Sequence, residues 1–457
     1  MEKKKKISLF SIIATLICVV FVAEAAAPVA ALGNTQYFWW IFMIVLFLVP
    51  YGLISSELGT AYAGEGGLYD WVHAAYPNTK WGARCSYWYW ANFPLWMASL
   101  AVMIPDLISI AFGIELNIFV SLIIQLAYIW IVTFICTYPI ADSVVILNIC
   151  AVIKVALAVI VGAMGIYFIV KNGFTNDMSA ATFLPSFDLD SLSFISVIIF
   201  NMLGFEVICT FSDDMKDPKK DIPKAIVIGG VVIAAVYLFS GFGIGSAIAT
   251  SEIAADSGLI DAFIAITGKE GGVFIGAIAL LFMVTLFGNM ISWSTGVHEC
   301  AAYAADNNDM PKIFAKRSAK NDMPIGGILM TGIVATVVVI LGVIMAVVAP
   351  DSELFWSFFA LNLVLFLLSY VPVFPGFLKL RKTDPDRERP YKVPGGPVLL
   401  KLMAIIPMIL IIVSVIFTAV PLSFDAETLA GVLPITIGAI IAIALGEILI
   451  KLRGRKK

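Results

Sequence analysis

The sequence predicts an all-α integral membrane protein with about twelve transmembrane helices. The chain is 61% hydrophobic and 13% charged, whereas soluble domains are nearer half apolar and a quarter charged. Its apolar residues form about twelve runs, each close to the ~20 residues that a membrane helix needs. Two of these runs carry a carboxylate near their middle, Glu24 and Glu206. These features indicate a polytopic membrane protein with charged groups built into its interior.

The spans are predicted at residues 8–32, 38–62, 85–113, 117–139, 143–170, 191–212, 223–250, 271–304, 324–349, 353–377, 398–421 and 430–451. An even number of spans places both termini on one side of the membrane. Of the 29 Lys and Arg, all but Lys154, Lys171 and Lys269 lie in the termini or in the loops on that side. The positive-inside rule therefore predicts that both termini are cytoplasmic and that the protein lies in the cell membrane.

The loop between the second and third spans, residues 63–84, is too polar to cross the membrane. Its glycines permit a tight turn. Leu68, Trp71, Val72 and Ala75 then form a short amphipathic pattern. We expect a short helix here that lies at the membrane interface.

Each of the two mid-membrane carboxylates lies beside a residue that interrupts helices. Glu206 follows Gly204 in the sixth span, and Glu24 precedes Pro28 in the first span. A charge in the hydrocarbon core costs at least ~2.5 kcal/mol, so such a residue is by default a functional candidate. Proline lacks an N–H and glycine tolerates unusual backbone angles, so both can free backbone groups at mid-membrane. Interrupted spans at corresponding places in two halves of a chain predict the substrate site of a transporter.

Other side chains inside the spans are candidates for the same site. Trp96 and Trp293 lie deeper than an interfacial belt requires, and a cation over a tryptophan face gains ~0.5–2 kcal/mol. Asparagines in apolar spans either join helices or contact substrate. The polar candidates are Asn92, Asp106, Asn201 and Asn289. The structural alternative is that the acids are paired or protonated in the fold and that the tryptophans only pack.

Four separated stretches of the chain resemble those of one known family. They read ELGT at 57–60 with GEGG at 64–67, GFE at 204–206 with KDP at 216–218, AADNNDMP at 304–311, and RPYKVPG at 389–395. In order and spacing they are similar to the amino acid–polyamine–organocation (APC) superfamily of secondary transporters. The resemblance implies one transmembrane domain over 1–457 with the LeuT-type 5+5 inverted repeat, in which helices 1 and 6 are broken at mid-membrane. Its parts are a first five-helix repeat at 8–170, a second at 191–377 and two last helices at 398–451.

One stretch departs from the amino acid carriers of this family, which usually have a glycine-rich break in the first span. Here the equivalent place reads AEAAAP at 23–28. Backbone N–H groups at such a break hold a substrate carboxylate, whereas Glu24 would repel a carboxylate and attract an ammonium. In this stretch and in PYGLI at 50–54, the chain resembles the polyamine and agmatine–putrescine exchangers. The expected substrate-binding residues are Glu24, Ala25, Ala26, Ala27, Pro28, Trp96, Asn201, Gly204, Phe205, Glu206 and Trp293, and the further candidates are Asp106, Asn92 and Asn289.

Lys154 is the only basic residue well inside a predicted span. In sodium-independent relatives a lysine of the fifth span stands near the place where sodium-coupled relatives hold an ion. The resemblance therefore implies a coupling role without sodium, in which the ammonium tethers the first span or carries a proton. The alternative is that Lys154 snorkels from the edge of its span.

The sequence contains no catalytic constellation, no metal-spaced Cys/His set and no nucleotide-binding loop. We therefore expect no enzymatic activity, cofactor or metal. The expected partners are a small-molecule amine or amino acid and membrane lipid, with no nucleic acid and no obligate protein partner. Three hypotheses stay open: a sodium-independent exchanger of cationic amines such as agmatine and putrescine; an amino acid permease or antiporter, for glutamate/GABA or neutral amino acids, with or without proton coupling; and a non-transporting sensor or accessory subunit. The two carboxylates favour the first over the second, and the short termini argue against the third.

Overall fold

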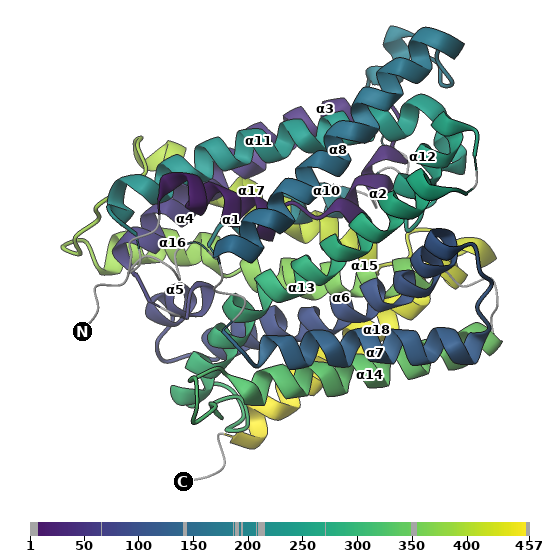
Figure 1. Ribbon diagram of the computed structural model, residues 1–457. Coiled ribbons are helices and arrows are strands. Elements are labelled where there is room, and N and C mark those ends of the chain that lie inside the picture. The colour runs from purple at the N-terminus through teal and green to yellow at the C-terminus, as the bar shows by residue number, and fades with distance from the viewer. Residues whose placement is uncertain are drawn as a thin grey trace.

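The computed structural model describes residues 8–64, 66–139, 144–185, 187, 192, 195–206, 208, 215–269, 271–348 and 354–453. All regular elements within these ranges are helices. The long helices run along one another in a bundle (Figure 1). Ten helices there are long and apolar enough to cross a membrane, or eleven when the bent pair at the N-terminus counts as one span. The all-helical membrane architecture is therefore confirmed. Of the predicted sixth span, only α10 (Ile195–Phe200) is a described helix.

The first predicted span is a bent pair of helices. The α1 helix (Leu9–Val20) is followed by a short 3-10 turn, η1 (Ala23–Ala25), and by α2 (Ala26–Ala30), and the two parts meet at 54°. The chain is extended at Phe21 and Val22. Tyr237 replaces the lost helical hydrogen bonds: its hydroxyl accepts from the Val22 N–H at 2.9 Å and donates to the Val22 carbonyl at 3.2 Å. The bend is thus held by a side chain of another helix.

Pro28 does not break this span, contrary to the prediction. The interruption lies at Phe21 and Val22, and Pro28 is the third residue of α2. The first N–H groups of a helix have no intrahelical partner, so a proline in the first turn costs little. Pro28 therefore fits the start of α2, and the bend comes before Glu24.

The sixth span is interrupted at the predicted glycine. After α10 the hydrogen bonding changes to an i to i−3 pattern, in which the Met202 N–H donates to the Ile199 carbonyl at 3.0 Å. Gly204 then takes a φ of +102°. That angle favours glycine. A Cβ at this position would also lie 2.7 Å from the Trp293 ring. Any larger residue would push this ring away.

The second span changes its helical pitch twice. It consists of α3 (Thr35–Met43), a π-helical turn η2 (Ile44–Leu48) and α4 (Val49–Ala61). The predicted short helix follows as α5 (Leu68–Ala75). Its apolar residues are buried against α6 and α16, so α5 packs on protein, and its position at the membrane interface stays a prediction.

The other helices match the remaining predicted spans, and 353–377 is covered by two helices, α15 and α16. They are α6 (Trp81–Phe112), α7 (Ile118–Cys136), α8 (Val144–Asn172), α11 (Pro218–Ala247), α13 (Val273–Asp306), α14 (Ile325–Val348), α15 (Leu354–Tyr370), α16 (Val373–Thr383), α17 (Pro397–Ala419) and α18 (Ala426–Arg453), with η3 (Ala180–Phe183), η5 (Thr250–Glu252) and α12 (Gly258–Thr267) in the loops. Figure 1 shows α6, α13 and α15 between a flank formed by α3 and α11 and a flank formed by α7 and α14. The start of α1 and the end of α18 lie at the same end of the bundle as α5, and α12 lies at the opposite end.

Candidate functional site

Glu24 is held in the interior by neutral hydrogen-bond donors. It lies in η1, directly after the bend of the first span, and is 1% exposed. The Asn289 amide of α13 donates to both carboxylate oxygens at 2.9 Å, and the Trp96 indole of α6 donates to Oε1 at 3.3 Å. No ion pair to Glu24 occurs within the described part of the chain. The side chains of Asn289 and Trp96 thus hold the Glu24 carboxylate between α13 and α6.

Glu206 is held in the same way by three tyrosines. It lies just after Gly204 and is 2% exposed. Tyr89 of α6 donates to Oε1 at 2.9 Å, Tyr370 of α15 donates to the same atom at 2.5 Å, and Tyr51 of α4 donates to Oε2. Again no ion pair is formed with a described residue. The three hydroxyls thus fix the orientation of the Glu206 carboxylate.

Aromatic side chains connect the two carboxylates. The rings of Trp96 and Trp293 meet edge-to-face at 5.8 Å, and Trp293 lies 6.4 Å from the ring of Tyr89. Trp96 donates to Glu24 and Tyr89 donates to Glu206, so these three rings form a path between the acids. Phe366 of α15 packs against Trp293 at 5.4 Å and against Tyr89 at 5.9 Å. The site is thus a pair of buried carboxyl groups separated by aromatic rings, and the faces of such rings attract cations.

The expected site residues around the interruptions are also buried. Ala25, Ala26, Ala27 and Pro28 form the turn and first residues of α2, where small side chains let the helix approach its neighbours. Trp293 fixes the other side of the bend, since its indole donates to the Val19 carbonyl at 2.5 Å. Phe205 packs against Tyr51, with ring centroids 6.1 Å apart.

Lys154 lies on α8 and is 0% exposed. Its ammonium donates to the carbonyl of Cys18, in the last turn of α1 just before the bend. A snorkelling lysine would carry its charge to the membrane surface, which this side chain does not do. The structure places it as a direct link between the fifth predicted span and the first.

Two polar candidates lie apart from the carboxylates. Asp106 is exposed on the last part of α6, so it does not belong to the buried acidic pair as we had considered. Asn92 donates to the carbonyls of Trp88 and Tyr89 in its own helix, at 3.4 and 2.6 Å. Its amide therefore supports α6 next to Pro94.

Two buried amides have no hydrogen-bond partner among the described residues. Both polar atoms of Asn201, at the end of α10, are unpaired, and the same holds for Asn362 on α15. Unpaired buried amides are costly and call for an explanation. Phe200, which precedes Asn201, packs against Phe359 and Phe366 on the face of α15 to which Asn362 belongs. The two amides thus lie on elements that pack against each other next to the aromatic path. Each of them can both donate and accept a hydrogen bond.

Sequence reasoning missed the three tyrosines around Glu206 and also Asn362. Tyr51 and Tyr89 lie within apolar spans, and Tyr370 follows Phe366 by four residues on one face of α15. A hydroxyl inside an apolar span was a usable signal, because buried tyrosines usually have a hydrogen-bond partner. Which partner they find depends on the packing of α4, α6 and α15, and this is not visible in the sequence.

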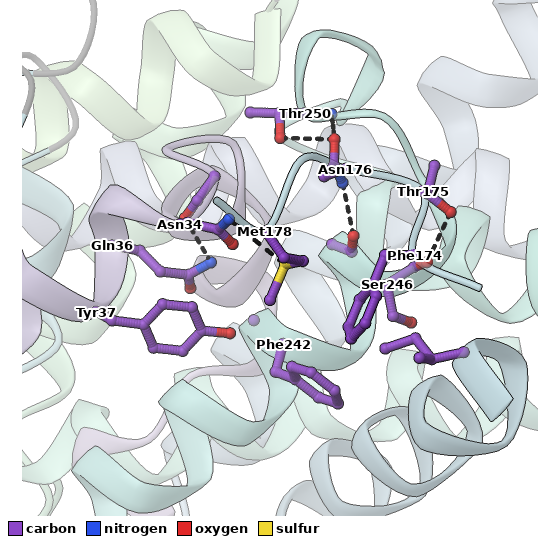
Figure 2. Close-up of a pocket in the computed structure, with 14 residues that line it drawn as sticks. Asn34, Gln36, Tyr37, Phe174, Thr175, Asn176, Met178, Phe242, Ser246 and Thr250 are labelled. Carbon is purple, nitrogen blue, oxygen red and sulfur yellow. Dashed lines mark hydrogen bonds between the residues drawn. The ribbon is translucent and has the colours of Figure 1, made fainter. Parts of the chain in front are cut away.

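A polar pocket lies apart from the carboxylates, between the start of α3, the ends of α8 and α11, and the loop after α8 (Figure 2). Asn176 joins its walls: the amide donates to the Gly245 carbonyl at 2.7 Å and accepts from the Thr250 N–H at 2.9 Å. Asn34 donates to the Asp177 carbonyl at 2.8 Å. The cavity measures about 20 Å³, which is room for about one water. It is too small for an amine substrate.

Comparison with known proteins gives one family match and several full-length relatives. The family described as Amino acid permease matches residues 7–445. A protein of Lactococcus lactis subsp. lactis named "Probable agmatine/putrescine antiporter AguD" is 60% identical over 448 residues, which cover 98% of this chain and 95% of that protein. A glutamate/gamma-aminobutyrate antiporter of the same organism is 22% identical, covering 92% and 84%. An Arabidopsis thaliana protein named "Probable polyamine transporter At1g31830" is 26% identical, covering 85% and 73%.

Proposed function

The chain belongs to the amino acid permease family of membrane transporters, and we propose that it exchanges cationic amines such as agmatine and putrescine across the cell membrane. Exchange would proceed by alternating access and without sodium. The observation that carries this proposal is the pair of buried carboxylates, Glu24 and Glu206, which have only neutral partners among the described residues. Two carboxylates in the membrane interior that form no ion pair with a described residue suit a substrate with two cationic ends.

A diamine would complete both hydrogen-bond sets at once. One ammonium or guanidinium at each end would add a charge-assisted hydrogen bond to each carboxylate. The alkyl chain between them would lie along Trp96, Trp293 and Tyr89, where apolar contact and the ring faces both favour it. Asn201 and Asn362 would supply further polar contacts. The name of the 60% identical relative supports this substrate class.

We infer the 5+5 inverted repeat, with repeats at 8–170 and 191–377 and two last helices at 398–451, from the placement of the two interruptions. The bend before Glu24 and the positive φ of Gly204 lie in the first helix of each proposed repeat. Twelve spans with both termini in the cytoplasm follow from the predicted sixth span and the positive-inside rule. In this proposal the two interrupted spans clamp the substrate and move against the spans around them.

The sodium-independent coupling rests on Lys154. A sodium site near α1 would need oxygen ligands such as backbone carbonyls, and here the Cys18 carbonyl is taken by the lysine ammonium. A fixed cation can hold α1 against α8 without an ion from solution. We propose that Lys154 replaces the ion in this role.

Exchange in proteoliposomes tests the substrate class. Vesicles loaded with unlabelled agmatine and diluted into labelled putrescine should accumulate label, and vesicles without internal amine should not. Unlabelled agmatine and putrescine should compete, whereas glutamate, GABA and neutral amino acids should compete weakly or not at all. Stronger competition by neutral amino acids would favour the amino acid carrier instead.

A further inference from the structure

An apolar groove runs along the outside of the bundle between the second predicted span and α11. Its volume is about 640 Å³, and its walls are residues of η2 and α4 on one side and of α11 on the other. Val49, Val227 and Val231 project from these walls and are half to two-thirds exposed. Small residues form the floor, among them Gly52 and Gly230. The groove is therefore a trough that faces the surrounding membrane.

One end of this groove is cationic. Lys224 lines it in the second turn of α11, and its side chain is exposed. Lys220, one turn earlier, pairs with Asp217 at 3.2 Å, whereas Lys224 makes no ion pair with any residue that the structure describes. Tyr391 lines the same groove and brings a phenol. The polar groups thus gather where α11 begins, and the rest of the groove is apolar apart from Ser56.

The length of the groove suits an acyl chain. Its α11 wall extends from Pro223 to Leu238, which is about 22 Å at 1.5 Å per residue. One leaflet contributes roughly half of the ~30 Å hydrocarbon core. An extended acyl chain of one leaflet can therefore lie in the groove with its headgroup at Lys224.

We propose that this groove binds an anionic phospholipid, with an acyl chain in the trough and the phosphate at Lys224. Charge complementarity decides the headgroup, because a lysine near the membrane surface attracts anionic lipid, and Lys224 has no ion pair to a described residue. The open side of the groove faces lipid, so a chain can enter laterally. A zwitterionic lipid would fill the apolar part equally well but would gain less at Lys224.

The lipid would lie directly behind the residues that hold Glu206. A Cβ at Gly230 would be 3.4 Å from Leu48 and 3.6 Å from the ring of Phe205, the residue before Glu206. Gly52 follows Tyr51, whose hydroxyl donates to Glu206. An acyl chain in the groove would therefore pack against α4 on the side away from Glu206, close to the interrupted sixth span.

Native mass spectrometry of the purified full-length protein tests the site. The probes are dioleoyl phosphatidylglycerol and dioleoyl phosphatidylcholine, which share their acyl chains and differ in headgroup charge. The wild-type protein should retain phosphatidylglycerol more strongly than phosphatidylcholine. Lys224→Gln should weaken the binding of phosphatidylglycerol about fivefold, because one lysine near an anionic surface contributes about 1 kcal/mol. The binding of phosphatidylcholine should be unchanged. Val231→Trp, which fills the groove, should weaken both lipids.

Matched controls separate this site from general lipid contact. Lys401 lies in the first turn of α17, and Ile409 is an exposed apolar residue of the same helix. Lys401→Gln and Ile409→Trp should leave lipid retention unchanged. Equal retention of the two lipids by wild type would overturn the proposal, and so would an equal loss in Lys224→Gln and Lys401→Gln. Unchanged retention in both groove variants would likewise reject it.

Discussion

Glu57 and Glu206 are both buried glutamates on predicted spans, yet their surroundings differ completely. Arg381 forms a bidentate pair with Glu57, at 2.6 and 2.5 Å, and Arg389 adds a contact at 3.1 Å. The Val393 N–H also donates to Glu57 at 2.7 Å. Glu206 has three tyrosine hydroxyls and no cation among the described residues. Glu57 is thus a buried acid with cationic partners, whereas the described partners of Glu206 are neutral, as the proposed binding of a cationic substrate requires.

The Glu57 cluster ties α4 to α16 and to the loop that follows it. Its charges are already compensated, so this acid has no need of a substrate. Glu24 resembles Glu206, because its donors are an amide and an indole. Among the buried acids that the structure describes, the two without an ion pair to a described residue are thus the two that lie at interrupted helices.

The largest expected effect is on stability. Glu57→Gln would leave two arginines without their anion in a buried place, and breaking such a pair typically costs ~3–5 kcal/mol. We expect a clearly lowered unfolding temperature in detergent and reduced yield. Glu206→Gln serves as the control and should unfold close to the wild-type temperature, because its tyrosines can bond to an amide. If both variants are equally stable, the contrast between the two acids is wrong.

The next effect is on substrate affinity. Glu206→Gln and Glu24→Gln each remove one anion from the proposed pair, and losing one partner of a buried charge pair costs ~2–5 kcal/mol. This corresponds to ~30-fold or more in affinity for a diamine. A monoamine of similar length needs one anchor only and should lose less.

Competition by unlabelled diamine measures this affinity separately from the transport rate. Glu447→Gln is the matched control, because Glu447 pairs with Arg84 at 2.5 Å away from the aromatic path. Diamine binding should be unchanged in that variant. Wild-type diamine affinity in both Glu24→Gln and Glu206→Gln would refute the cationic-amine site.

Much of this arrangement could be predicted from local sequence, and some could not. The apolar runs predict most of the spans, and Gly204 predicts the break of the sixth span because its positive φ is a local property of that residue. The first break was misplaced by several residues, since it depends on Tyr237, 215 residues away. The three tyrosines that donate to Glu206 are likewise 117 to 164 residues away from it in the sequence. Hydrogen bonds made across the bundle leave no periodic pattern in the chain.

A smaller effect is expected at Lys154. Lys154→Ala leaves the Cys18 carbonyl without its donor, a loss of ~1–3 kcal/mol for a buried group. We expect a folded protein whose exchange is about tenfold slower. Lys171→Ala is the control on the same helix, where the side chain lies over the Tyr167 ring near the helix end. Wild-type uptake measured in sodium and in choline buffer should be equal, and a tenfold loss in choline would contradict the proposed role.

The smallest expected effect concerns the orientation of Glu206. Tyr370→Phe removes one of three donors but keeps the ring that packs on Phe366 at 5.1 Å. The carboxylate keeps its charge and two donors, so the cost should be about 1 kcal/mol, or roughly fivefold in diamine affinity. Tyr128→Phe is the matched control, since its hydroxyl donates to the Leu286 carbonyl at 3.1 Å. A loss as large as that of Glu206→Gln would mean that Tyr370 contacts the substrate itself. No loss in the variant would mean that two hydroxyls suffice to orient the anion, and the comparison with Glu57 would then rest on charge alone.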